Sequence, residues 1–244
     1  MLAFGFAAVL TAAPALAQVA AQIAAAVADP GRPEADRARD ADRKPVDVLG
    51  YADVKPGDKV AELIPGGGYF TRILAKVVGP NGHVYAVIPA LPAQAPADIQ
   101  SLQAIAKANP NVTLVEGPLL AFRPPQKLDV VWTSENYHDL RNPRYGRQDI
   151  PRFNKMVFDA LKPGGVFYIE DYAAAAGAGA TQTATLHRID PATVKQEVEA
   201  AGFRLELSSD ILHHAEDNHT LAIFDPAIRR GHADRLVMRF RKPR

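Results

Sequence analysis

The stretch that decides the fold is Val60–Phe70, which reads V-A-E-L-I-P-G-G-G-Y-F. An apolar run containing Glu62 leads into Gly66, Gly67 and Gly68, and an apolar segment follows them. Consecutive glycines permit positive φ and let a ligand lie against bare backbone, while the first amides of a following helix point outward unpaired. The pattern predicts either a cofactor cradle after a strand, with Glu62 accepting hydrogen bonds, or a plain strand-to-helix turn.

Apolar runs and turn signals on both sides of this stretch alternate between strand and helix. Such alternation with right-handed crossovers predicts an α/β, doubly wound, mostly parallel Rossmann-like sheet of about seven strands with helices on both faces. Its binding crevice lies outside the carboxyl ends of the strands. We expect strands at Lys59–Ile64, His83–Ile88, Val112–Glu116, Leu128–Ser134, Val166–Tyr172, Phe203–Ser208 and Thr220–Phe224, and helices at Tyr69–Val78, Ala97–Ala108, Ile150–Leu161 and Pro191–Gly202.

The bulk composition fits one globular domain and excludes several classes of function. The 244 residues carry 28 basic and 27 acidic side chains, a formal charge of +1, so no overall field draws the chain to nucleic acid. The basic segment Arg235–Arg244 is interpreted as a solvated strand or tail. Since the chain has no cysteine, disulfides and thiolate sites are excluded. No feature indicates the oligomeric state.

The first residues resemble an export signal. Leu2–Leu10 is apolar, and Ala15-Leu16-Ala17 forms a small-residue cleavage pattern ahead of Gln18. We therefore expect a signal peptide at 1–17, an alanine-rich leader and linker at 18–38, and a single domain at 39–244 in an exported, periplasmic protein without a stable membrane span. No Lys or Arg precedes the apolar run, so a membrane-associated helix is the alternative.

Polar residues gather where the strand at Leu128–Ser134 ends. Glu135, Asn136, His138 and Asp139 follow this apolar strand closely. His138 titrates near neutral pH and can act as a general base oriented by Asp139 or Glu135, while Asn136 can bind a polar atom of a ligand. The alternative is that Asn136 and Asp139 make turn and capping hydrogen bonds around a packed histidine.

Further candidates follow the strand at Val166–Tyr172. Asp171 ends that strand and faces the same crevice if Glu170 points outward. The glycine-containing run Ala173–Ala180 suggests a mobile cover, after which His187 and Arg188 can bind substrate, Arg188 as a partner for an anion. A solvated helix entry capped by Asp190 is the alternative.

One histidine cluster has the residue types of a metal site. His213, His214 and His219 surround Glu216 and Asp217, but their spacing matches no established zinc pattern. A polar hairpin between two strands explains them, so we expect no metal site.

Three motifs in chain order resemble the class I S-adenosylmethionine-dependent methyltransferases. Val60–Thr71 is similar to the first motif of that family, Leu128–Leu140 to its fourth-strand segment, and Leu161–Asp171, L-K-P-G-G-V-F-Y-I-E-D, to its fifth-strand segment. More narrowly, the E-x-x-P-G-G-G-Y-F turn, N-Y-H-D and the leader resemble a group of exported bacterial predicted methyltransferases. The resemblance implies S-adenosylmethionine as cofactor and methyl transfer to an unidentified small molecule; a repurposed, noncatalytic binding protein is the alternative.

The resemblance also implies roles for individual residues. The cofactor contacts would be Glu62, Pro65, Gly66, Gly67, Gly68, Glu116 and Asn136; the catalytic residues His138, Asp139 and Asn136; and the substrate contacts Tyr137, Asp171, His187 and Arg188.

The chain departs from the family pattern at three places. Ile64 replaces the first family glycine, Val87-Ile88-Pro89 lacks the acid that grips the ribose, and Glu116-Gly117-Pro118 displaces the acid near the adenine. Loss of a bidentate ribose contact weakens binding by about ten- to a hundredfold.

Overall fold

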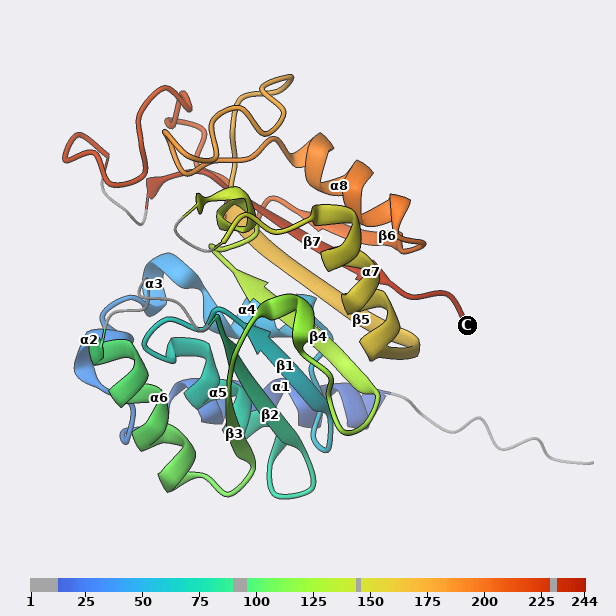
Figure 1. Cartoon of the computed structure of the whole chain (residues 1–244). Coiled ribbons are helices and arrows are strands. Elements are labelled where there is room, and N and C mark those ends of the chain that lie inside the picture. The colour runs from blue at the N-terminus through green and yellow to red at the C-terminus, as the bar shows by residue number, and fades with distance from the viewer. Residues whose placement is uncertain (1–12, 90–95, 144–145, 229–231) are drawn as a thin grey trace, which may run out of the picture.

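A single seven-stranded sheet forms the centre of the molecule (Figure 1). The computed structural model describes residues 13–89, 96–143, 146–228 and 232–244. The strand order is β3-β2-β1-β4-β5-β7-β6, with β1 to β5 parallel and β7 antiparallel to both of its neighbours. The predicted fold class is therefore confirmed. The strands are β1 (Lys59–Leu63), β2 (His83–Ile88), β3 (Val112–Glu116), β4 (Leu128–Ser134), β5 (Leu161–Tyr172), β6 (Arg204–Ser209) and β7 (Arg235–Arg241).

Helices cover both faces of the sheet because successive strand residues point to opposite sides. On β4, Val130 and Trp132 pack into one core with α1, α4, α5 and α6, whereas Val131 packs into the other with α7 and α8. The helices are α1 (Ala13–Val27), α2 (Glu34–Arg37), α3 (Asp40–Arg43), α4 (Pro45–Tyr51), α5 (Tyr69–Val78), α6 (Pro96–Ala108), α7 (Ile150–Ala160) and α8 (Pro191–Ala200), with 3₁₀ turns η1 (Leu119–Ala121) and η2 (His138–Arg141).

The N-terminal helix α1 belongs to the folded unit. It contacts α4 and α5, and its Ile23 and Ala26 side chains are buried in the core. The Gln22 side-chain amide donates a hydrogen bond to the Val77 carbonyl at 2.9 Å. The alanine-rich segment predicted as a leader thus supplies an apolar helix face that packs onto the domain predicted to begin near Arg39.

Cleavage after Ala17 would cut α1 and leave in place the part that carries the buried Ile23 and Ala26. The cleavage itself stays a prediction. In the described part of the chain, no helix has the length and apolar character needed to cross a membrane.

The seventh strand is Arg235–Arg241, which corrects two predictions. Leu236, Met238 and Phe240 alternate along it and are buried, so the segment is a core strand rather than a solvated tail. Thr220–Phe224, predicted as a strand, forms turns in the loop between β6 and β7. β7 takes the place beside β5 that this segment would have filled as the seventh strand.

Removing the buried Ile23 side chain tests whether α1 is part of the domain. Ile23→Ala should lower the free energy of unfolding by about 2–5 kcal/mol, the usual cost of truncating a buried aliphatic side chain. Ala24→Ser, on the exposed face of α1, should change it by less than about 0.5 kcal/mol. Urea unfolding of the full chain measures both. Equal effects of the two substitutions would mean that α1 does not support the core.

Candidate functional site

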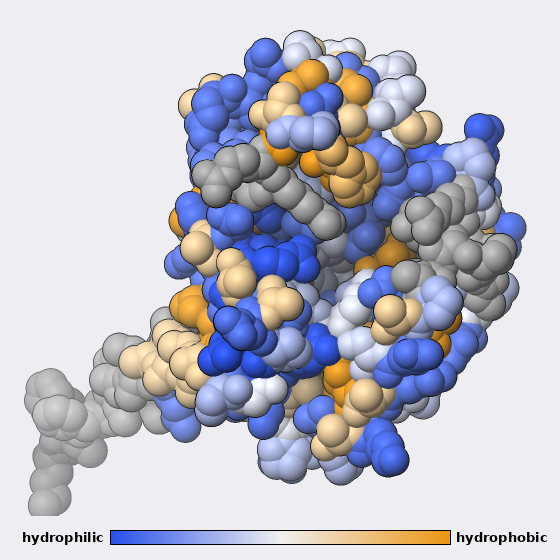
Figure 2. Space-filling model, turned by 90° about the vertical axis from the view of Figure 1, so that its left-hand side faces the viewer, coloured by the Kyte–Doolittle hydropathy of each residue, from blue (hydrophilic) through white to orange (hydrophobic). Residues whose placement is uncertain are grey.

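A pocket of about 430 Å³ opens at the carboxyl ends of β1 and β4. Figure 2 shows this side of the molecule, where hydrophilic side chains surround a central hollow. The strand order reverses between β1 and β4, and such a reversal leaves a crevice in an open α/β sheet. The two segments singled out in the sequence, the glycine turn after β1 and the polar run after β4, both line this pocket.

The glycine turn presents its backbone to the pocket. Ile64, Pro65, Gly66 and Gly67 line it, and Ile64 and Gly66 have φ of 54° and 55°. The left-handed region is unfavourable for a β-branched residue, so Ile64 holds a strained conformation that the family glycine would adopt freely. Ile64 therefore adopts a backbone conformation that a glycine would adopt without strain.

Gly68 has a packing role, which corrects its assignment to the cofactor. It does not line the pocket, and it begins α5 with φ of 84°. A Cβ atom there would lie 2.4 Å from Ile105 Cδ1 and 3.2 Å from Leu102 Cδ2. Glycine at this position lets α5 and α6 pack closely.

Glu62 is a buried acid on the pocket wall. Its residue is 3% exposed, and Thr71 Oγ1 donates a hydrogen bond to Oε2 at 2.5 Å. Burial raises the pKa of Glu62 to about 8, although Thr71 and the nearby Arg43 and Arg72 act in the opposite direction. The carboxyl therefore holds a proton at neutral pH and becomes an anion readily when a cationic group lies beside it.

Asn136 connects the two strand ends that form the crevice. Its side-chain amide donates to the Ile64 carbonyl at 2.9 Å and to the Ser134 carbonyl at 2.5 Å. The neighbouring Glu135 has φ of 61°, a second left-handed residue at the pocket. Asn136 thus lines the pocket as predicted and fixes the position of the glycine turn.

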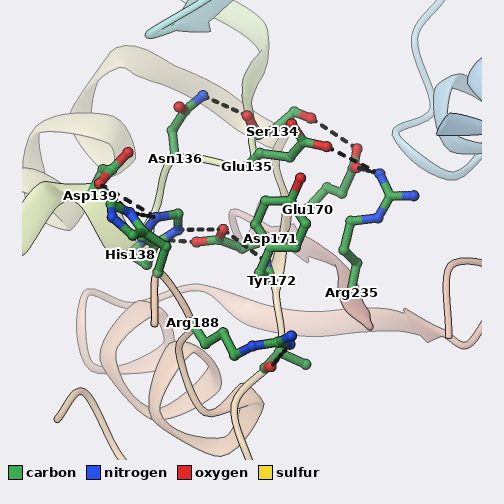
Figure 3. Close-up of polar contacts among 12 residues, drawn as sticks. Ser134, Glu135, Asn136, His138, Asp139, Glu170, Asp171, Tyr172, Arg188 and Arg235 are labelled. Carbon is green, nitrogen blue, oxygen red and sulfur yellow. Dashed lines mark hydrogen bonds and ion pairs between the residues drawn. The ribbon is translucent and has the colours of Figure 1, made fainter. Parts of the chain in front are cut away.

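A cluster of two histidines and two acids lies beyond Asn136 (Figure 3). Asp171 accepts hydrogen bonds from the His138 amide at 2.6 Å and from His138 Nδ1 at 2.7 Å. On the other side of the ring, His138 Nε2 lies 3.2 Å from His187 Nδ1 and 3.4 Å from Asp139 Oδ1. His138, Asp139 and His187, distant in sequence, are therefore brought together on one pocket wall.

The acids control the charge of this cluster. Burial lowers the pKa of His138, but Asp171 and Asp139 raise it more, so that it lies above its ordinary value. Burial raises the pKa of Asp139, but His187, His138 and Asn142 lower it more, and the net shift is downward. The pair Asp171–His138 has the geometry of a base with an orienting carboxylate. Asp171 is fully buried and does not line the pocket, so its predicted contact with substrate is corrected to a role in positioning His138.

Buried charges support the wall behind Glu135. Arg235 Nη1 lies 3.0 Å from Glu170 Oε1 and 3.2 Å from Glu135 Oε1, and Arg43 Nη2 donates to Ser134 Oγ at 2.8 Å. Burial raises the pKa of the Glu170 carboxyl, which Arg235 and Arg43 lower only in part. This network joins α3, β4, β5 and β7, and Figure 3 shows part of it.

Three predicted ligand contacts lie away from the pocket. The Tyr137 hydroxyl is buried between Asn154 and Glu197, and Arg188 is fully buried in an ion pair with Asp217 at 2.8 Å. Arg188 also donates to the Ala173 and Leu221 carbonyls, so it braces loops and is not available to an anionic substrate. Glu116 does not line the pocket either. A side chain that follows a strand end can turn into the second core as easily as into the crevice.

The run Ala173–Ala180 does not cover the pocket. None of its residues lines it, and the Gly177 and Gly179 amides donate to Asp190, the residue that caps α8. The prediction of a cover over the site is therefore wrong.

The histidines of the β6–β7 loop have structural partners. His213 Nδ1 and His219 Nε2 each lie 2.9 Å from the Asp234 carboxylate, which ties the loop to the start of β7. The polar hairpin predicted here is in fact a long loop. Within the described residues, a possible metal-binding group in this loop consists of His214, Glu216 and His232, which are at least partly exposed.

Several pocket residues carried no local signal in the sequence. Asp36 comes from the segment predicted as a linker, Arg39 and Arg43 from the start of the predicted domain, where no helix or strand was expected, and Phe224 from the segment predicted as a strand. Asp98, in the first turn of α6, brings a carboxylate oxygen to 3.1 Å from the position of a Cβ on Gly67. The dense alternation of acids and arginines in 36–43 was the one available hint, because such a pattern suits a polar wall as well as a solvated linker.

Solved structures with this fold are methyltransferases and related enzymes. An S-adenosylmethionine-dependent methyltransferase from Aquifex aeolicus aligns over 91% of this chain and 98% of its own, with TM-score 0.58 and 16% identity. The N-methyltransferase NodS from Bradyrhizobium japonicum aligns over 84% and 96%, with TM-score 0.54 and 14% identity. The [4+2]-cyclase SpnF aligns over 83% and 81%, with TM-score 0.59 and 14% identity. The chain has the class I methyltransferase fold.

In sequence, the chain is similar to a protein-L-isoaspartate O-methyltransferase from Ignicoccus hospitalis, with 38% identity over 66 residues. The match spans 27% of this chain and about a third (31%) of that protein. No family model matches the chain.

The raised pKa of Glu62 predicts how stability depends on pH. Its pKa is about 8 in the folded chain against 4.5 ordinarily, so between these values the folded state keeps a proton that the unfolded state releases. The free energy of unfolding should therefore fall by up to about 1.4 kcal/mol per pH unit across this window through Glu62 alone. Glu62→Gln should remove this contribution, as measured by urea unfolding at pH 5.5 and 7.5.

Glu34→Gln, at an exposed position, is the control and should keep the wild-type pH dependence. An unaltered pH dependence in Glu62→Gln would show that Glu62 ionises normally in the fold.

Proposed function

We propose that this chain is an S-adenosylmethionine-dependent methyltransferase that acts on a small molecule. The supporting observation is that the glycine turn and the His138 cluster, predicted separately, line the two ends of one pocket on a methyltransferase fold. The pocket volume of about 430 Å³ lies within the range of small-molecule sites. Export of the mature protein after cleavage at Ala17 is part of the proposal.

The cofactor would lie along the turn after β1. Bare backbone at Gly66 and Gly67 lets the cofactor approach closely, and Asn136 and Glu62 offer an amide and a carboxyl at its amino-acid end. Asp98 lines the same pocket beside Gly67 and follows β2, so it is our candidate for the ribose hydroxyls in place of the acid missing at Ile88.

The acceptor would lie toward His138, Asp139 and His187. Methyl transfer from a sulfonium requires alignment of the acceptor atom with the methyl group and removal of the acceptor proton. In the simplest form of the proposal, His138 Nε2 accepts this proton, since Asp171 holds Nδ1 on the other side of the ring. The acceptor is then a hydroxyl, thiol or amine that enters beside His187.

Binding of S-adenosylmethionine should release protons from Glu62. At pH 7 the carboxyl is protonated in the free protein, and the positively charged cofactor favours its anion. Calorimetric titration in two buffers of different ionisation enthalpy should give up to one proton released per cofactor. Glu62→Gln should abolish the release and weaken binding by about ten- to a hundredfold, the loss of one charged hydrogen bond.

Asp98→Ala is the matched variant, since it should weaken binding by a similar factor but keep the proton release. Absence of both heat and thermal shift at millimolar cofactor would refute the proposal. A different small molecule retained in a native mass spectrum would then favour a repurposed binding protein.

Substitution at the acceptor end should separate binding from turnover. His138→Gln should bind S-adenosylmethionine within about threefold of the wild-type affinity, because His138 is not among the proposed cofactor contacts. It should lose at least about a hundredfold in turnover, the contribution of a general base. Release of S-adenosylhomocysteine across a panel of hydroxyl, thiol and amine acceptors measures turnover. Wild-type turnover in the variant would remove His138 from the mechanism.

A further inference from the structure

Three atoms able to donate electron pairs converge on the acceptor side of the pocket. His138 Nε2, His187 Nδ1 and Asp139 Oδ1 form a triangle with sides of 3.2, 3.4 and 3.6 Å. Among the three sides of the triangle, only the one between the two imidazoles is short enough for a good hydrogen bond. A small cation at the centre of the triangle would bind all three atoms together.

The sides of the triangle match a tetrahedral ion. Zinc binds imidazole nitrogen and carboxylate oxygen at about 2.0–2.2 Å, which puts neighbouring ligand atoms of a tetrahedron about 3.3–3.5 Å apart. A cis pair in an octahedron with the same bonds would be only about 3.0 Å apart. Two imidazoles with one carboxylate also suit zinc better than magnesium or calcium, which prefer oxygen ligands.

Neighbouring side chains hold the ligands in the geometry that a metal requires. Asp171 accepts a hydrogen bond from His138 Nδ1 at 2.7 Å, which directs the lone pair of Nε2 into the triangle. Asn142 donates to Asp139 Oδ1 at 3.2 Å, and the His187 ring packs against Phe224 with centroids 5.0 Å apart. His187 has φ of 54°, in the left-handed region, which histidine adopts more often than most residues other than glycine.

We propose that His138, Asp139 and His187 bind a zinc ion, with Asp171 as the carboxylate that orients His138. All three ligand residues line the pocket, so the fourth position of the ion is open to water or to the acceptor. No local pattern in the sequence predicted this site, because His187 lies 48 residues after Asp139 in the chain. The metal-type pattern in the sequence lay elsewhere, at His213, His214 and His219.

The zinc ion would select the acceptor, a consequence that rests on the proposed methyl transfer. A hydroxyl or thiol bound at the fourth position loses its proton to solvent more readily, since zinc lowers the pKa of a bound ligand. The bound oxygen or sulfur anion then forms a bond to the methyl carbon as the bond from that carbon to the sulfonium sulfur breaks. The products are the methylated acceptor, S-adenosylhomocysteine and one proton. Zinc thus favours hydroxyl and thiol acceptors over ammonium groups, and His138 is then a ligand rather than the base.

Metal titration of the untagged full chain tests the site. The wild-type protein, freed of metal with a chelator and dialysed, should bind one zinc ion at micromolar concentration or below, and cobalt should give the intense visible absorption of a tetrahedral site. His187→Ala should weaken zinc binding by at least about tenfold, as should Asp171→Asn through the orientation of His138. His232→Ala is the matched control, because His232 belongs to the second histidine group of the described residues and its loss should leave the first ion bound.

Two results would overturn the inference. Zinc binding that survives His187→Ala but is lost in His232→Ala would place the ion in the β6–β7 loop, and no binding by the wild-type protein would leave a hydrogen-bonded histidine pair only. The His187 side chain is 24% exposed in the wild-type protein. Circular dichroism of the His187→Ala variant shows whether that variant is folded. Calorimetry with S-adenosylmethionine is an independent readout: cofactor binding without zinc refutes the metal site alone, and zinc binding without cofactor refutes the methyl transfer alone.

Discussion

The reversal of strand order between β1 and β4 is the constraint on which the site depends. Crossovers to β2 and β3 leave β1 in one direction, whereas those to β5 and beyond leave β4 in the other, so no connection fills the gap between the two strand ends. Asn136 spans this gap with hydrogen bonds to the carbonyls of Ile64 and Ser134. The Asn136 side-chain amide, which lines the pocket, therefore fixes the glycine turn after β1 and the polar run after β4 relative to each other.

Buried charge holds the remaining walls in place. Glu170 is fully buried on β5, and Arg235 of β7 and Arg43 of α3 compensate it. An arginine removed from such a network leaves a buried carboxyl without a partner, which costs more than the pair contributes. The network consequently joins the N-terminal α2–α3 segment, which supplies one rim of the pocket, to the centre of the sheet.

The two ends of the pocket favour positive charge in different ways. At the glycine turn, burial keeps Glu62 protonated until a cation lies beside it. At the far end, Asp139 and Asp171 place negative charge around His138 and raise its pKa. Both ends of the pocket therefore favour a positively charged group, which fits the proposed transfer of a methyl group from a sulfonium to an acceptor that loses a proton.

Patterns in the sequence were sufficient to predict the order of most elements and the two strand ends that form the site. Periodicity and glycine placed α5, β2, β3 and β4 at their observed bounds, because local propensity and burial pattern agree there. The sequence also predicted that Glu62, Asn136, His138 and Asp139 line the site, since residues at or just after the end of a parallel strand lie near the crevice. Tertiary structure alone decided which side chains enter the pocket: Tyr137 and Arg188 turned into buried contacts, whereas Arg43, Asp98 and Phe224 entered from segments without a local signal. The tertiary structure also made Arg235–Arg241 a core strand and placed α1 against the domain. The burial of a segment depends on which surface its neighbours leave uncovered, and that surface is a property of the whole fold.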